Sequence, residues 1–355
     1  MVPSTGDLTL PTQNAIKVGA ILPLTGDVSI VGTSIEQGIG IAKDEINQTG
    51  GINGRKLEVI VEDDHYDNAA SVTAANKLLS VDKIDAGIIA LVHGAKSVKP
   101  VFEKARVPLV VAWDSTREIE SGDYVFSTGF STERAGIEMA DFAFLRLDAR
   151  KTAIVLHQDE WSEIIGPAFQ KEFEQRGGSV ALIERVAVGE LDFRTILSKI
   201  RDQHVDSVYF PLVPVGSDVF MKQAHELDLN VMLLSGDALI PDIIAAASPA
   251  AEGVYFTNIS AEDNPISQKL LGKYRTKFGK DPVALPMVAF GYDAMMAVAT
   301  AAQKTPNATP EQIKDALYSV DFVGAGGRIQ INPSGLSDRV ENVYRIANGE
   351  PVRVE

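Results

Sequence analysis

Short apolar runs alternate with longer amphipathic segments along most of this chain. Residues 16–24 (IKVGAILPL) form one apolar run, and residues 57–63 alternate between apolar and polar side chains. Both patterns are typical of strands. Between them, apolar residues recur at helical spacing: Ile35, Ile39, Ala42 and Ile46. We therefore predict strand, helix, strand, with Thr33 or Ser34 capping the helix.

The alternation continues to about residue 258. Further strands are predicted at 87–92, 108–113, 124–128, 152–157, 180–188, 207–212, 231–234 and 253–258. Helices are predicted between them: one after Asp67 as cap, 97–106, 133–147, 163–176, one after Asp192 as cap, and 215–227. Regular alternation predicts an α/β fold with parallel sheets. Since the units are too many for one core, we predict two doubly wound lobes.

The pattern changes after residue 258. Three helices are predicted, at 266–278, 287–303 and 310–319, followed by a glycine-rich turn at 324–327. Two short strands are predicted last, at 328–331 and 340–346. We expect no membrane span, because no window approaches about 18 consecutive apolar residues. Residues 1–14 are polar and contain proline, so we interpret them as a linker after a removed signal or lipid anchor, or as a frayed natural terminus.

The composition excludes several classes of partner. The chain has 355 residues, 45% of them hydrophobic, and a net charge of −15. This charge argues against nucleic acid and against an anionic membrane surface, both of which attract Lys and Arg. The chain has no cysteine, which excludes disulfides and thiolate chemistry.

Motifs for catalysis and cofactors are missing from the sequence. It contains no phosphate-binding glycine loop and no GxSxG, and its five histidines lack metal-ligand spacing. Residues 62–67 (EDDHYD) suggest a cation site, but a strand end followed by the helix cap Asp67 explains them better. We predict that the protein is not an enzyme and that it uses neither a cofactor nor a metal ion. We predict that it binds a small molecule reversibly.

Polar residues gather where two predicted strands end. His93, Lys96 and Ser97 follow the strand at 87–92, and Asp114 and Ser115 follow the strand at 108–113. Because ligands bind at the carboxyl edge of open α/β sheets, we expect a binding site here.

Several motifs follow one another along the chain: the opening strand 16–26, the helix and turn 38–56 (GIGIAKDEINQTGGINGRK), residues 57–75, and residues 251–255 and 290–294. In their order and spacing, the chain resembles the type I periplasmic solute-binding proteins, specifically the leucine/isoleucine/valine-binding family of ABC importers. The resemblance covers about residues 15–350.

The resemblance implies a periplasmic or extracytoplasmic receptor that captures a small amino acid or related carboxylate and delivers it to an ABC permease. It implies two lobes, joined by three crossovers, that close on the ligand. Lobe 1 would be residues 15–130 plus 262–336, and lobe 2 residues 131–260 plus 337–355. The crossovers would lie near 127–132, 258–265 and 334–340. A signalling domain of this fold, or an enzyme of doubly wound fold, is the alternative.

The resemblance also implies site residues. Ser97, the Trp113 backbone and Ser115 would hold the ligand carboxylate in lobe 1, with His93 and Lys96 at the rim. In lobe 2, Asp237 would hold the ammonium and Trp161 would cover the ligand.

The chain departs from the family pattern at five positions. Val31, Val213 and Met287 stand where the family has aromatic residues, and Trp113 and Asp114 replace small ones. We therefore expect Asp114, Val213 and Met287 to line a reshaped cavity.

Several site residues also have a purely structural interpretation. Ser115 would cap a turn, Asp237 would cap a helix near Ala238, and Trp161 would pack on a lobe surface. Asp114 and Lys96 would form a local ion pair.

Overall fold

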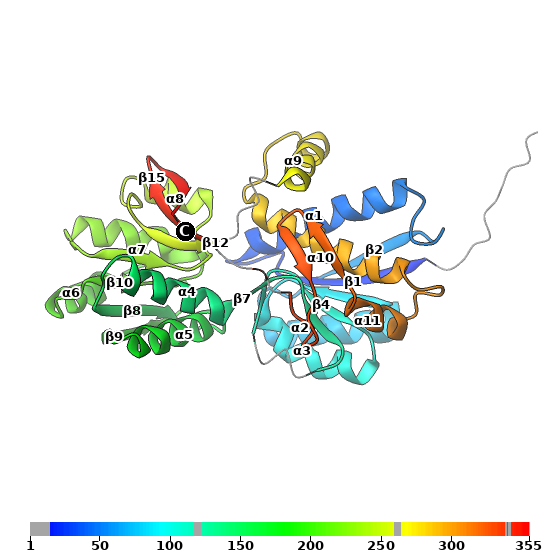
Figure 1. Cartoon of the computed structure of the whole chain (residues 1–355), viewed down its shortest axis with the longest axis horizontal. Coiled ribbons are helices and arrows are strands. Elements are labelled where there is room, and N and C mark those ends of the chain that lie inside the picture. The colour runs from blue at the N-terminus through cyan, green and yellow to red at the C-terminus, as the bar shows by residue number, and fades with distance from the viewer. Residues whose placement is uncertain (1–14, 117–121, 259–263, 338, 340–341, 355) are drawn as a thin grey trace, which may run out of the picture.

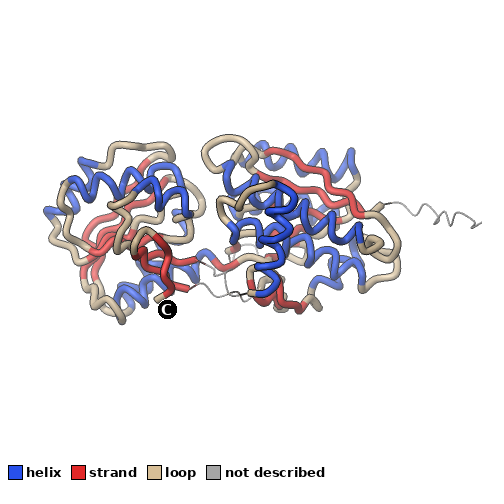
Figure 2. Tube along the Cα trace, turned by 90° about the horizontal axis from the view of Figure 1, so that it is seen from above, coloured by secondary structure: helices blue, strands red, loops and turns tan. Residues whose placement is uncertain are grey.

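The computed structural model describes residues 15–116, 122–258, 264–337, 339 and 342–354. Two bodies lie side by side, each built around a twisted sheet with helices on both faces (Figures 1 and 2). The predicted class, two α/β lobes with mainly parallel sheets, is confirmed.

The first sheet has five strands, all parallel. Their order is β2 (Leu57–Asp63), β1 (Ile16–Leu22), β3 (Ala86–Ile89), β4 (Leu109–Val111) and β6 (Val125–Ser127). Its helices are α1 (Ser29–Gln48), α2 (Asn68–Lys77) with the π-helical turn η1 (Leu78–Asp82), α3 (Val92–Ala105), α9 (Pro265–Phe278), α10 (Leu285–Gln303) and α11 (Pro310–Leu317). A hairpin of β13 (Asp321–Gly324) and β14 (Gly327–Gln330) follows α11.

The second sheet has seven strands. Their order is β16 (Glu350–Arg353), β15 (Asn342–Ala347), β12 (Tyr255–Asn258), β11 (Met232–Ser235), β10 (Ser207–Tyr209), β8 (Lys151–His157) and β9 (Ser179–Val186). Its helices are α4 (Thr132–Leu145), α5 (Ser162–Gln175), α6 (Arg194–Asp202), α7 (Pro214–Glu226) and α8 (Pro241–Ala247). The late strands β15 and β16 join its edge in antiparallel pairs.

Buried strands explain the continuous apolar runs of the sequence. Ala20 of β1 belongs to the core under α1 and α10, and the next residue, Ile21, belongs to the core under α2 and α3. A strand covered on both faces therefore needs apolar residues at successive positions. α1 and α10 pack so closely that a Cβ on Gly38 would lie 2.0 Å from the Val288 carbonyl oxygen.

α10 corrects one expectation from the sequence. Leu285–Gln303 is long and apolar enough to cross a membrane, although no such window was expected. However, 78% of its apolar window is buried in the first lobe. We therefore interpret α10 as the central core helix of that lobe.

Helix starts were only partly predicted. Asp67 caps α2 as expected, because its carboxylate accepts a hydrogen bond from the Ala70 N–H. α1 begins at Ser29, so the caps predicted at Thr33 and Ser34 are wrong, and the Thr33 hydroxyl instead bonds to the Ser29 carbonyl. α6 has Phe193 at its N-cap, so the Asp192 cap is also wrong.

The lobe boundaries stay a prediction. The first expected crossover, at 127–132, leads from β6 into α4, and β5 (Asp114–Ser115) pairs with β7 (Phe130–Ser131) beside it. The other two, at 258–265 and 334–340, lie partly outside the described residues, as does the whole N-terminal linker at 1–14.

A buried ion pair joins Arg339 to α10 of lobe 1. Asp293 of α10 accepts hydrogen bonds from the Ala325 and Gly326 N–H groups at 2.6 and 2.9 Å, and from Arg339 at 2.6 Å. Asp293 is completely buried, and Arg339 is 5% exposed. The Arg339 guanidinium also lies 4.4 Å from the centre of the Phe290 ring.

We expect Asp293→Ala to lower the free energy of unfolding by about 3–5 kcal/mol, because it leaves Arg339 buried without its counter-charge. Urea denaturation followed by circular dichroism measures this. Asp321→Asn is the matched control, because the Asp321–Arg328 pair is exposed and contributes less than about 1 kcal/mol. Equal effects of the two substitutions would contradict the structural role given to Asp293.

Candidate functional site

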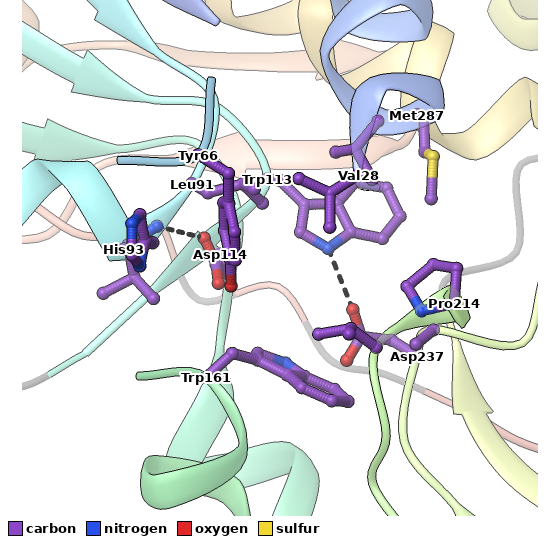
Figure 3. A pocket seen from close by; sticks show the side chains of 14 residues that line it. Val28, Tyr66, Leu91, His93, Trp113, Asp114, Trp161, Pro214, Asp237 and Met287 are labelled. Carbon is purple, nitrogen blue, oxygen red and sulfur yellow. Dashed lines mark hydrogen bonds between the residues drawn. The ribbon is translucent and has the colours of Figure 1, made fainter. Parts of the chain in front are cut away.

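A small cavity of about 50 Å³ lies between the two lobes (Figure 3). Both sheets direct their strand ends toward it. Its lining residues are Val28, Val31, Tyr66, Leu91, Val92, His93, Trp113, Asp114 and Met287 from lobe 1, and Trp161, Val213, Pro214, Asp237 and Ala238 from lobe 2. Most of this lining is apolar or aromatic, as in ordinary small-molecule sites.

Trp113 forms the upper wall of the cavity in Figure 3. It follows β4, and its ring packs against Phe130 and Phe290 at centroid distances of 5.5 and 4.8 Å. Its indole N–H donates a hydrogen bond across the lobes to Asp237 Oδ2 at 2.8 Å. Aromatic packing therefore fixes the donor that meets lobe 2.

The side chain of Asp114 lies at the N-terminus of α3. Its Oδ1 accepts a hydrogen bond from the Val92 N–H, the first residue of that helix, at 2.6 Å. Burial raises the pKa of the Asp114 carboxyl well above its usual value, and the nearby Asp237 and Glu160 carboxyls raise it further. The bond also explains why α3 begins at Val92, five residues before the predicted start.

Asp237 is the acidic group of lobe 2. It follows β11 and is 3% exposed. Among the described residues, its Oδ1 has no hydrogen-bond partner within ordinary range. Burial raises the pKa of Asp237 to about 6, although the Trp113 and Trp161 indoles act to lower it. α8 begins at Pro241 with Ile240 as N-cap, so the alternative role of Asp237 as a helix cap is wrong.

Two further contacts shape lobe 2. Gly236 allows Trp161 to approach, because a Cβ there would lie 2.9 Å from the indole ring. The Val213 N–H donates to His157 Nδ1 at 3.1 Å. Burial lowers the pKa of His157 to about 4, so it is a neutral acceptor that holds the Val213 loop in place.

Tyr66, His93 and Lys96 lie at the cavity rim, close to several carboxyl groups. The Tyr66 ring stacks on His93 at 4.0 Å. Burial and the Asp159, Asp114 and Glu160 carboxyls raise the pKa of Tyr66 well above its usual value. Lys96 pairs across the lobes with Glu160 at 2.9 Å, so the expected Asp114–Lys96 ion pair is wrong.

The structure brings seven of the ten predicted site residues to the cavity: His93, Trp113, Asp114, Trp161, Val213, Asp237 and Met287. Lys96 lies at the rim, Ser97 lies on α3 away from the lining, and the Ser115 side chain is outside the described part of the chain. Their roles in ligand binding stay predictions. Tyr66 was missed, and its position directly after β2, at the same sheet edge, was the available signal.

The acidic stretch 62–67 is structural. Asp63 accepts from the Leu24 N–H, Asp64 accepts from Ser71, and Asp67 caps α2. Across the described residues, no group of three or more His, Asp or Glu side chains is placed to hold a metal ion.

Comparison with known proteins decides the family. The model of the periplasmic binding protein family matches residues 15–348. This chain belongs to that family. It is therefore a solute-binding protein and not an enzyme, and it works outside the cytoplasm.

Relatives of this binding protein include the leucine-, isoleucine-, valine-, threonine-, and alanine-binding protein of Pseudomonas aeruginosa, at 26% identity over 91% of the chain and 87% of the relative. A leucine-binding protein, LivK, from Thermotoga maritima has a TM-score of 0.87 at 26% identity, covering 96% of this chain and 98% of that one. A solute-binding protein from R. palustris in complex with benzoate has a TM-score of 0.84 at 20% identity, covering 96% of each chain. The names of these relatives thus include branched-chain amino acids and benzoate.

We expect Asp237→Asn to stabilise the binding protein more at pH 8 than at pH 5, without added solute. Because burial raises the folded-state pKa of Asp237 to about 6, its stabilising contribution is complete below the unfolded value and is lost as pH rises through 6. Melting by circular dichroism should show a gain of a few degrees at pH 8 and a smaller gain at pH 5, because pH 5 lies between the unfolded and folded pKa of Asp237.

Asp281→Asn is the control for this experiment, because Asp281 is an exposed partner of Arg275 and its pKa is lowered. A pH-independent effect of Asp237→Asn would contradict the assignment.

Proposed function

We propose that this binding protein is the solute receptor of an ABC importer, which encloses one small solute between its lobes and delivers it to the permease. The observation that supports this proposal most strongly is the cavity. It lies at the carboxyl edges of both sheets, and the hydrogen bond from Trp113 to Asp237 joins the two lobes there. Its location would be the periplasm or, if a lipid anchor exists, the outer surface of the cytoplasmic membrane.

Closure of the lobes would be the step that commits the solute. Trp113–Asp237 and Lys96–Glu160 both join lobe 1 to lobe 2 beside the cavity. A solute that contacts both walls favours the closed arrangement by its differential affinity for it. A permease that recognises the closed receptor would thereby receive a loaded one.

The solute would be small, largely apolar and equipped with an amino group. Asp237 provides a buried acceptor for that group, and Val28, Val213 and Met287 provide the apolar surface. The Leu/Ile/Val-binding relatives support an amino acid or related carboxylate, the class predicted from the sequence.

Sensing is the second candidate role, because a signalling domain of this fold would use the same cavity. Permease genes beside the gene for this chain favour import, and an attached signalling partner favours sensing.

Ligand-induced stabilisation tests the receptor function. A library of amino acids, amines, amides and organic acids should contain at least one compound that raises the melting temperature. At 100 times Kd, a specific ligand adds about 2.7 kcal/mol to the free energy of unfolding. If no compound class shifts the melting curve, the receptor function is contradicted.

Asp237→Ala should weaken that ligand by several kcal/mol, about 2–5, because it leaves a buried ammonium without its partner. Isothermal titration calorimetry measures the change. Asp281→Asn is the control, since it removes one exposed carboxylate that does not line the cavity. Unchanged affinity in Asp237→Ala would mean that the ligand brings no ammonium to this position.

A further inference from the structure

A carboxyl group of the protein itself already caps the helix start that faces the cavity. The N–H groups in the first turn of a helix commonly bind an anionic ligand group. Here Asp114 Oδ1 accepts from the Val92 N–H at 2.6 Å, and Asp114 is 1% exposed. A ligand carboxylate at this position would meet the carboxyl of Asp114 at close range.

A second carboxyl faces the same cavity with one oxygen unsatisfied. Asp237 Oδ2 accepts from Trp113, and the side chain is 97% buried. Among the described residues, Oδ1 has no hydrogen-bond partner within ordinary range, although the Trp161 indole lies close enough to lower the pKa of the carboxyl. A buried acceptor without a donor destabilises the protein until something donates to it. The unsatisfied oxygen therefore indicates a ligand that brings a hydrogen-bond donor.

The described residues that line the cavity are acidic where they are ionisable, apart from His93 and Tyr66. The described lining residues include two aspartates and no lysine or arginine. Lys96, a cation at the rim, pairs with Glu160 at 2.9 Å. Asp159 is a further acidic group beside Tyr66, and the Glu160 carboxylate is the partner of Lys96. A buried carboxyl without a counter-charge binds a proton more readily, as the raised pKa values of Asp114 and Asp237 show. A cationic solute would let both carboxyls ionise.

The aromatic walls suit a positive charge as well. Trp113 and Trp161 lie on opposite sides of the Asp237 carboxyl in Figure 3, and Tyr66 lies beside Asp114. Cations are attracted to the faces of such rings, most strongly to Trp. The other lining residues are mainly aliphatic and leave the rest of the solute apolar.

We propose that the solute is a compact organic cation, an amine protonated at neutral pH and free of carboxylate, whose charge lies between Asp114 and Asp237. Asp114 is then the residue that determines specificity, because its carboxyl occupies the position that the carboxylate of a bound amino acid would need. The inference rests on the proposed receptor function. It keeps the amino group of the solute proposed there and replaces the amino-acid or carboxylate class, because Asp114 occupies the place of a ligand carboxylate.

Matched compounds separate the two charges of an amino acid. Alanine, leucine, ornithine and phenylalanine would each be compared with the amine left by decarboxylation, the acid left by deamination, and the amide of that acid. For leucine these are 3-methylbutylamine, 4-methylpentanoate and 4-methylpentanamide. Titration calorimetry at pH 7.5 measures each Kd.

We expect at least one amine to bind 100-fold more tightly than its parent amino acid, with no binding of the acids and amides. Tighter binding of an amino acid, acid or amide overturns the inference but leaves the receptor function standing. Absence of binding by every compound also overturns it, and the wider thermal-shift library then decides the receptor function separately.

Two substitutions of Asp114 test its role. Asp114→Asn keeps an acceptor for the Val92 N–H and removes the charge, so it should fold and bind the amine at least tenfold more weakly. Asp114→Ser removes the carboxyl and exposes the helix start, so it should also gain affinity for the parent amino acid. Asp281→Asn should leave the ratio of amine to amino-acid affinity unchanged. Full amine affinity in Asp114→Asn overturns the inference.

Proton release provides a second readout. Asp237 faces the Trp113 and Trp161 indoles and Asp114, and Asp114 faces the Val92 N–H, Asp237 and Glu160. Burial raises the pKa of both carboxyls, and a bound cation would lower it. At pH 6, amine binding should release protons, measured as a dependence of the binding heat on the buffer. A buffer-independent heat overturns the inference.

Discussion

The hydrogen bond from the Val92 N–H to Asp114 links the local structure of lobe 1 to the chemistry of the cavity. It starts α3 at Val92, so that His93 lies in the first helical turn. It also places a carboxyl at the cavity wall with almost no access to solvent. Removing such a group from water is unfavourable, and the raised pKa of Asp114 reflects this cost.

Asp237 is a second buried carboxyl, from lobe 2, and its hydrogen bond with Trp113 connects the two lobes. The Trp113 indole compensates one oxygen, and packing on Phe130 and Phe290 holds that indole in position. The other oxygen faces the cavity. Ligand binding and lobe closure are therefore coupled. A ligand that donates a hydrogen bond to Asp237 also stabilises the contact between Asp237 of lobe 2 and Trp113 of lobe 1.

The resemblance to Leu/Ile/Val-binding proteins extends to the fold more firmly than to the ligand. The sheets and the helix pair α1 and α10 depend on backbone geometry and apolar burial, which many sequences satisfy. The solute depends on a few side chains at the strand ends. At those positions this chain has Trp113 and Asp114, which change both the volume and the charge of the cavity.

The sequence by itself determined the fold class, most of the elements and the sheet edge that carries the site. Apolar periodicity reports burial directly, and residues after a parallel strand must lie at its carboxyl edge. It did not determine where α1 and α3 begin. For α3 the reason is that its first N–H donates to Asp114, which is 22 residues away in sequence. The partners of Asp114, Lys96 and Asp237 were likewise decided only by tertiary structure. Hydrogen bonds between lobes depend on how two separately folded sheets approach each other, and no local pattern records that distance.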